Sequence, residues 1–347
     1  MMVTPLCHGE GGQKAMTYKM VVIGAAGHVN YVLDELGAYP QVRFCAYAPS
    51  FPDEDVSRYA SATAFAIPER YDEWRAMLDA ERPHIVVAVG RYDTNAPIAI
   101  EALRRGCHVV AEKPAAHTLE EVATLRQLVA DHGVVYASLL NMRYLPAFYT
   151  ARLLVAQGLI GTPVLISGQK SYRWGGKRPR WYADRAAYGS TMTWVGIHCF
   201  DYGRWIADVQ YTEVFAYHAN LVHTERPGCQ DVATVIARLD NGGSAVYHLD
   251  FLRPTAARTH GDEPLRVAGS RGVLEICDQT ERLHVITEER DEPSWPLQQP
   301  PRSLFGDIVA AIEGRGSLLV PADEAFTATE FAIKAAQAAD TGCIVPM

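Results

Sequence analysis

The chain has 347 residues, of which 48% are hydrophobic and 21% charged, and its formal net charge is −8. This length is enough to bury two hydrophobic cores, so two domains are expected. The acidic balance argues against attraction to a nucleic-acid backbone or to an anionic membrane, and we expect neither as a partner. No apolar run approaches the roughly 20 residues that a membrane-spanning helix needs.

Two features of the sequence bear on its compartment. Residues 1–17 have no basic region that leads into an apolar one, so they are interpreted as a disordered extension and not as a signal peptide. The 7 cysteines are scattered, odd in number and never spaced as C-x-x-C. This usage favours a reducing, cytoplasmic setting, and it offers no second ligand pair with zinc spacing, so no metal is expected.

Residues 18–140 alternate between strand-like apolar runs and helical patterns, which is typical of β-α-β units around a parallel sheet. Expected strands cover 20–23, 42–48, 85–89, 108–111 and 134–137, and expected helices cover 29–36, 72–80, 96–105 and 118–131. Each strand is apolar enough to be buried on both faces. These five runs are interpreted as a six-strand nucleotide-binding pattern of which one strand is not located, so we predict an α/β, Rossmann-like domain with a doubly wound parallel sheet.

The periodicity changes after Pro146. One helix is expected at 147–157, followed by alternating strands at 232–239 and 244–251, which flank the hairpin signal Asp240-Asn241-Gly242-Gly243. Further strands are expected at 265–268, 273–276 and 283–286, and closing helices at 303–312 and 323–339. Residues 141–347 are therefore predicted to form an α+β domain with an open, mostly antiparallel sheet, which binds substrate and mediates oligomerisation.

The first strand runs directly into Gly24-Ala25-Ala26-Gly27-His28-Val29, where a doubly wound fold places its phosphate-binding turn. The first glycine permits the tight turn, whereas Ala26 and Val29 replace the second and third glycines of the fingerprint. The second strand ends in Ala46-Tyr47-Ala48-Pro49-Ser50, without the carboxylate that would bind the adenosine ribose. Ser50 offers a hydrogen bond, but no arginine stands beside it, so the choice between NAD and NADP stays open.

The segment Glu112-Lys113-Pro114 follows the strand at 108–111 and is the most specific motif in the chain. It resembles the glucose–fructose oxidoreductase/inositol dehydrogenase (Gfo/Idh/MocA) family, which carries Glu-Lys-Pro after the fifth strand of its nucleotide-binding domain. Further family-like stretches occur in the expected order at 141–147, 159–161, 181–205 and 267–275 and in the two closing helices. The resemblance covers residues 18–345 and implies an NAD(P)-dependent oxidoreductase.

The resemblance also implies a catalytic pair, Lys113 and His198. The carboxyl ends of parallel strands face the cofactor crevice, so the Lys113 ammonium is placed to favour a developing alkoxide. The family commonly presents an aspartate and a histidine four residues apart on its substrate-site helix; here His198 matches the histidine, and Trp194 stands at the aspartate position. We expect His198 to be the acid/base, Asp201 to orient it in part, and Trp194 to offer an apolar face to a sugar ring.

The expected site residues come from both halves of the chain. The dinucleotide site is expected to take Gly24, Ala25, Ala26, Gly27, His28, Val29, Ser50, Gly90, Glu112, Lys113 and Arg143. The substrate is expected to contact Trp181, Trp194, Asp201, Arg173 and Arg180. The two arginines belong to a basic, aromatic loop at 170–181, which is typical of a lid for an anionic substrate, although a solvated loop or a subunit contact is the simpler explanation.

One function is preferred and two alternatives are kept. The preferred function is hydride transfer between NAD or NADP and a secondary alcohol or ketone of a sugar, cyclitol or sugar acid. The alternatives are a non-catalytic NAD(P)-binding sensor or regulator, which Trp194 favours, and an NAD-dependent lyase or glycosidase with a transient redox cycle. We expect a small-molecule, sugar-like substrate and, because the open sheet face needs covering, a homodimer or homotetramer.

Overall fold

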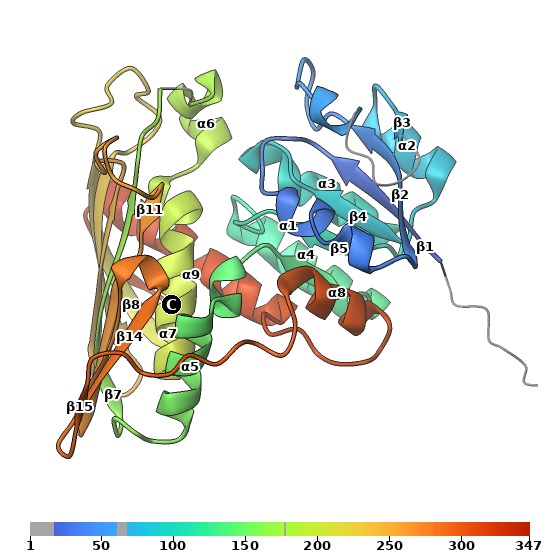
Figure 1. Ribbon diagram of the computed structural model, residues 1–347. Helices are drawn as coiled ribbons and strands as arrows, with labels where there is room; N and C mark the ends of the chain where they lie inside the picture. The colour runs from blue at the N-terminus through green and yellow to red at the C-terminus, as the bar shows by residue number, and fades with distance from the viewer. Residues whose placement is uncertain (1–16, 61–67, 177) are drawn as a thin grey trace, which may run out of the picture.

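The computed structural model describes residues 17–60, 68–176 and 178–347. These residues contain a six-stranded sheet and a ten-stranded sheet, which lie on opposite sides of Figure 1 with helices between them. The extension predicted for residues 1–17 lies outside the described residues except for residue 17. Within the described part of the chain, every helix is too short or too polar to cross a membrane.

The first part of the chain alternates strands and helices. Its strands are β1 (Tyr18–Ile23), β2 (Val42–Ala48), β3 (Glu69–Arg70), β4 (Ile85–Ala88), β5 (His108–Ala111) and β6 (Tyr136–Ser138), and its α-helices are α1 (Asn30–Leu33), α2 (Trp74–Glu81), α3 (Tyr92–Arg104) and α4 (Leu119–His132). The strand order is β3-β2-β1-β4-β5-β6 with every pair parallel, which confirms the predicted doubly wound sheet. The strand β3 has only two residues, too few for a periodicity to predict it.

The helices around this sheet follow the sequence patterns to different degrees. The Thr118 side chain accepts a hydrogen bond from the Glu121 N–H (3.1 Å), and this capping box begins α4 as predicted. The helix α3 begins at Tyr92, earlier than the predicted start at residue 96. The prediction missed the first turn because its residues are mostly polar and carry no apolar repeat. The helix predicted at 29–36 divides into the short α1 and a 3₁₀ turn at Leu36–Ala38.

The second part of the chain builds the larger sheet. Its strands are β7 (Pro163–Tyr172), β8 (Tyr211–Ala219), β9 (Val232–Leu239), β10 (Ser244–Asp250), β11 (Gly261–Asp262), β12 (Leu265–Gly269), β13 (Gly272–Cys277), β14 (Arg282–Thr287), β15 (Asp291–Glu292) and β16 (Val345–Pro346). Its helices are α5 (Pro146–Ala156), α6 (Arg185–Tyr188), α7 (Ile197–Ala207), α8 (Leu304–Ile312) and α9 (Ala322–Thr341). The strand β10 pairs with β7 in parallel and the other pairs are antiparallel, which confirms the mostly antiparallel sheet.

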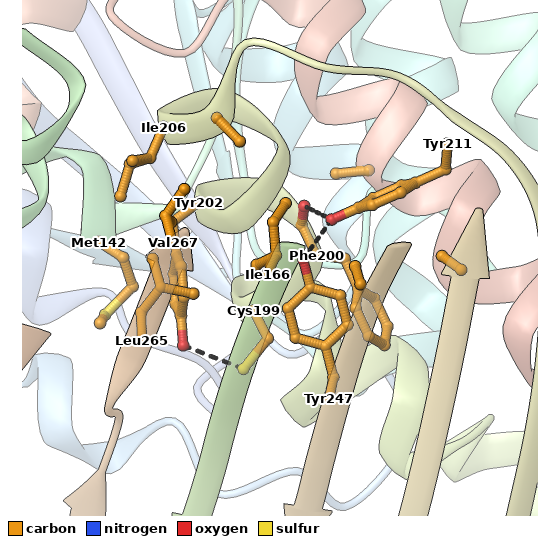
Figure 2. Packing of buried hydrophobic residues seen from close by; sticks show 14 of the residues in the cluster. Met142, Ile166, Cys199, Phe200, Tyr202, Ile206, Tyr211, Tyr247, Leu265 and Val267 are labelled. Atoms are coloured by element: carbon orange, nitrogen blue, oxygen red, sulfur yellow. Dashed lines mark hydrogen bonds between the residues drawn. The ribbon is translucent and has the colours of Figure 1, made fainter. Parts of the chain in front are cut away.

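Helices α5, α7 and α9 cover one face of this sheet (Figure 1). Buried tyrosines hold α7 in place: the Tyr211 hydroxyl donates to the Phe200 carbonyl oxygen (3.0 Å) and lies 2.5 Å from the Tyr247 hydroxyl, as Figure 2 shows. The Tyr202 hydroxyl lies 3.0 Å from Cys199 Sγ on the same helix. Because these buried polar atoms have partners, the helix keeps a fixed position on the sheet.

The last two helices return to the first sheet. Leu304, Phe305 and Ile308 of α8 pack in the same core as β1 and β2, and Phe326 of α9 lies 4.9 Å from the Tyr136 ring centroid. The end of the chain therefore connects the two halves by direct packing. The domain boundary at residue 140 stays a prediction. The packing shows that α8, although late in the chain, belongs to the core of the first sheet.

Candidate active site

The turn after β1 lies against the ends of β2 and β4. Gly24 has a φ of +87°, which residues with a side chain rarely adopt, and a Cβ there would lie 2.3 Å from Gly90 Cα. A Cβ at Gly90 would in turn lie 2.2 Å from Ser50 Oγ. The backbone is therefore closely packed at the point where the strand order reverses, which is where a doubly wound fold binds a dinucleotide.

An acidic side chain stands at this crevice although the end of β2 supplies none. Glu54 Oε2 accepts hydrogen bonds from the Ser50 N–H (2.6 Å) and hydroxyl (2.8 Å), and Glu54 Oε1 accepts one from the Ala25 N–H (2.8 Å). This corrects the expectation of a crevice without a carboxylate. The strand end does not predict Glu54 because the residue comes from the following loop, where the acidic run 53–55 was the available signal.

Glu112 connects the turn to the Glu-Lys-Pro segment. Its buried Oε2 accepts a hydrogen bond from the His28 N–H (2.6 Å) and lies 2.9 Å from His28 Nδ1. A Cβ at Gly27 would lie 2.4 Å from the same oxygen, so a glycine is needed there for this approach. Burial alone would raise the pKa of Glu112, but the hydrogen bonds of His28 and the charges of His28 and Lys113 lower it overall, so the carboxylate stays ionised.

Lys113 is almost fully enclosed, with 1% of its surface exposed. Its Nζ donates a hydrogen bond to the Trp194 carbonyl oxygen (2.8 Å). Burial lowers the pKa of Lys113 to about 7; the charge of Glu112 opposes this effect, and the charges of Lys170 and Arg178 reinforce it. A group with a pKa close to the working pH is suited to take up and release a proton.

Trp194 lies in the π-helical segment Met192–Gly196 that leads into α7, and such segments often occur at functional sites. Its indole ring stacks on Tyr92 with 3.5 Å between ring centroids and 19° between planes, and Lys113 Nζ lies 3.2 Å from the indole centroid. Two groups this close cannot share one face, so they cover opposite faces. Stacking of a sugar ring on Trp194, as expected from the sequence, therefore requires the indole to move.

His198 lies in the first turn of α7 and is 5% exposed. None of the residues that the structure describes hydrogen-bonds its buried Nδ1. Burial holds the pKa of His198 well below its usual range, and the charges of Lys113, Lys170 and His28 lower it further. His198 is therefore neutral near pH 7, so it can hydrogen-bond a substrate oxygen but is poorly suited to carry a proton.

Arg143 and Asp201 bind each other instead of the residues around Lys113. Arg143 Nε donates to Asp201 Oδ2 (3.0 Å) and Nη2 donates to Oδ1 (2.5 Å), and both side chains are buried. Nη2 also donates to Glu324 on α9 (2.9 Å). The structure thus corrects the expectation that Asp201 orients His198. Arg143 lines a separate cavity of about 630 Å³, whose lining includes neither catalytic candidate.

The loop between β7 and α6 reaches the first domain through an aromatic residue. The Trp181 ring meets the Tyr92 ring edge to face, with 4.6 Å between centroids. Arg173 Nη1 donates to the Thr255 carbonyl oxygen (3.2 Å), and Arg180 is exposed. The structure therefore brings Trp181 against Tyr92 of the first domain, whereas Arg173 is engaged with backbone. Among residues 17–60, 68–176 and 178–347, no group of three His, Cys, Asp or Glu side chains could hold a metal ion.

The fold and the site define a protein of the Rossmann class with a dinucleotide crevice beside a buried lysine. Residues 19–139 match the model of the oxidoreductase family with an NAD-binding Rossmann fold, and residues 148–275 match the GFO/IDH/MocA C-terminal domain. The chain belongs to the Gfo/Idh/MocA oxidoreductase family, which confirms the resemblance seen in its sequence.

Three similar proteins illustrate this membership. A solved structure of a provisionally named oxidoreductase from Thermotoga maritima is 34% identical to this chain. The match covers 95% of this chain and 100% of that one, with a TM-score of 0.89. Inositol 2-dehydrogenase of Rubrobacter xylanophilus is 25% identical over 74% of this chain and 71% of its own. The uncharacterized oxidoreductase YrbE of Bacillus subtilis is 32% identical over 43% of this chain, and the match spans less than half, 46%, of that relative.

Proposed function

We propose that the protein is an NAD(P)-dependent oxidoreductase that interconverts a secondary alcohol and a ketone of a sugar or cyclitol. The observation that carries this proposal is Lys113, buried at the carboxyl end of β5 and connected through Glu112 to the dinucleotide turn. When bound, a nicotinamide accepts or supplies the hydride. The similarity to an inositol 2-dehydrogenase supports the substrate class.

The residues of the crevice fit a dinucleotide. The turn at 24–29 brings backbone close to the space where a pyrophosphate binds, because Gly24 and Gly90 leave no room for side chains between the strand ends. Glu54, from the loop after β2, accepts hydrogen bonds from Ser50 just beyond the strand end, which is where the adenosine ribose is expected. A carboxylate there accepts hydrogen bonds from ribose hydroxyls and repels a 2′-phosphate, so we propose NAD as the preferred cofactor.

Lys113 is proposed as the proton carrier, a role that the sequence assigned to His198. The unprotonated Lys113 amine accepts the hydroxyl proton of the substrate while the C–H bond breaks and the carbonyl forms, and the ammonium returns the proton in the reverse direction. The buried, neutral His198 imidazole hydrogen-bonds the same substrate oxygen. This division of roles follows from the pKa of Lys113 near 7 and the strongly lowered pKa of His198.

The test is a paired measurement of binding and turnover on the wild-type protein and on Lys113→Met. Reduction of NAD during a polyol and sugar screen, lost in the variant while NAD binding persists, is the expected result. The contact of Trp194 with Lys113 favours a second candidate, the sensor that binds without turnover, because the indole covers the reactive amine. Binding without any reduction would favour that sensor over the oxidoreductase.

We also propose a cytoplasmic homo-oligomer. Leu165, Tyr217 and Ile236, from β7, β8 and β9, are exposed apolar residues of the large sheet. They alternate along their strands with residues buried under the helices, so they lie on the uncovered face. Burial of such residues against a second copy would remove apolar surface from water.

A further inference from the structure

A second charged pair, Lys170 and Glu263, lies buried beside β7 in the second domain. Lys170 is on β7 and is 1% exposed; its Nζ lies 3.0 Å from Glu263 Oε1, 3.7 Å from Met142 Sδ and 5.2 Å from the Tyr172 ring centroid. Glu263 stands between β11 and β12 and is mostly buried. A buried ion pair is weak support for stability, because desolvation offsets the attraction, so its presence calls for a functional reason.

Two observations place the Lys170–Glu263 pair next to the reacting groups. The helix α7, which carries His198, packs directly on β7, where the Tyr202 hydroxyl donates to the carbonyl oxygen of Gln169 (3.4 Å), the neighbour of Lys170. In agreement with this packing, the Lys170 charge lowers the pKa of both Lys113 and His198. From the first sheet, the chain that leaves β6, the neighbour of β5, brings Met142 Sδ to 3.7 Å from Lys170 Nζ. These contacts place the pair close to the helix that carries His198 and to the strand ends beside Lys113.

Two arginines of the neighbouring loop, Arg173 and Arg178, are engaged elsewhere, and Arg180 is exposed. Arg178 Nε and Nη2 donate to the carbonyl oxygens of Trp174 (2.7 Å) and Arg173 (3.0 Å), and its guanidinium lies over the Phe251 ring. Arg173 itself donates to the Thr255 carbonyl oxygen. These arginines therefore bind loop backbone. Lys170, in contrast, has a carboxylate partner, Glu263.

We propose that the Lys170–Glu263 pair is the specificity-determining element for an uncharged polyol: the ammonium donates to one hydroxyl oxygen, and the carboxylate accepts from the adjacent hydroxyl. This inference rests on the proposed function and selects, within sugars, cyclitols and sugar acids, the neutral members. An ammonium has three donors and a carboxylate has several acceptor positions, so the pair keeps capacity for a ligand. A substrate carboxylate would be repelled by Glu263 in a region with little water.

The test compares matched neutral and acidic sugars on the full-length protein. Binding of D-glucose and D-glucuronate, and of D-galactose and D-galacturonate, is measured by calorimetry in the presence of NADH, and kcat/KM is measured wherever NAD is reduced. The variants are Glu263→Gln, which leaves the Lys170 charge unpaired, and Lys170→Gln/Glu263→Gln, which keeps the volume without the charges. Glu275→Gln, from an exposed pair with Arg266, is the matched control.

We expect the wild type and the control to prefer the neutral member of a pair at least tenfold. Glu263→Gln should shift this ratio at least tenfold toward the acid, and the double variant should weaken neutral binding without that shift. An unchanged ratio in Glu263→Gln, a wild-type preference for the acid, or no binding of any sugar would overturn the proposal. Selective binding of the neutral sugar without NAD reduction would instead contradict the proposed function and would still support the specificity role of the Lys170–Glu263 pair.

Discussion

The Nζ atom of Lys113 lies 3.2 Å from the centroid of the Trp194 indole ring and donates a hydrogen bond to the carbonyl oxygen of the same residue. The family pattern expects an aspartate where Trp194 stands, so an aromatic ring replaces a carboxylate as the neighbour of the buried amine. An indole face favours an ammonium by about 0.5–2 kcal/mol, less than a buried carboxylate would. The exchange therefore keeps Lys113 close to the balance between its two protonation states.

The first prediction concerns pH. Oxidation of an alcohol requires Lys113 without its proton, so kcat/KM should rise with pH up to about pH 7, the pKa of Lys113, and then level off. The reverse reduction needs the ammonium and should decline above the same pH. Lys113→Arg, whose side chain stays charged, should be inactive throughout the range. A limb that persists in an active Lys113→Arg protein would assign the titration to another group.

Trp194→Leu should move this limb to lower pH by about 0.4–1.5 pH units. Leucine keeps the surroundings apolar but removes the indole face that favours the ammonium, so the pKa of Lys113 should fall. Trp194→Asp should move the limb in the opposite direction, since a carboxylate stabilises the ammonium more strongly. The pH profile of kcat/KM for both variants checks these signs, and identical limbs in both would contradict the role given to the indole.

Glu54 should determine the choice between NAD and NADP. Glu54→Gln removes the repulsion of a 2′-phosphate, so the ratio of the Kd for NADP to that for NAD should fall by at least tenfold, which corresponds to about 1.4 kcal/mol. Asp72→Asn, an exposed carboxylate beyond the end of β3, serves as the control. Equal discrimination in the wild type and in Glu54→Gln would exclude Glu54 as the determinant.

Gly27 should tolerate no side chain. The Cβ of Gly27→Ala would lie 2.4 Å from the buried Glu112 Oε2, so Glu112 must shift, and we expect a loss of about 1–3 kcal/mol in the free energy of unfolding with weaker NAD binding. A Cβ at Gly37 meets no atom within 4 Å, so Gly37→Ala is the matched control. Denaturant unfolding and NAD titration of both variants test this, and equal stability would refute the close contact.

The Arg143–Asp201 pair should matter for stability and not for the pH profile. Asp201→Ala leaves Arg143 buried without its main partner and should cost about 3–5 kcal/mol in the free energy of unfolding. Glu213→Ala breaks an exposed pair with Arg238 and should cost less than about 1 kcal/mol. If the pH dependence of kcat/KM shifted in Asp201→Ala while stability changed little, Asp201 would again be assigned as an orienting group for His198.

How much of the structure can be predicted from the sequence depends on how far apart in the chain the interacting residues lie. The parallel strands could be predicted because β4 and β5 are short apolar runs whose burial depends on local composition, and α4 because Thr118 and Glu121 form a local capping box. The motif with Lys113 could be located because it follows a strand directly. In these cases neighbouring residues contain the whole signal.

Other features depend on contacts between distant segments. Glu54 reaches the crevice through a loop, Asp201 finds Arg143 58 positions away, and Trp194 meets Lys113 and Tyr92 only because two domains pack together. No periodicity or spacing in the sequence predicts these contacts. We propose Lys113 in place of His198 as the acid/base for the same reason, since burial by both domains lowers the pKa of Lys113 and of His198 to different degrees.

The most direct test of the central claim is a titration of tryptophan fluorescence with NAD, followed in the same samples by the absorbance of reduced nicotinamide during a screen of neutral sugars and cyclitols. The wild type and Lys113→Met are compared, because methionine keeps the length and apolar stem of the lysine. The account predicts that both proteins bind NAD with similar affinity and that only the wild type reduces it. Reduction by Lys113→Met at the wild-type rate, or a wild type that binds no NAD, would contradict the account.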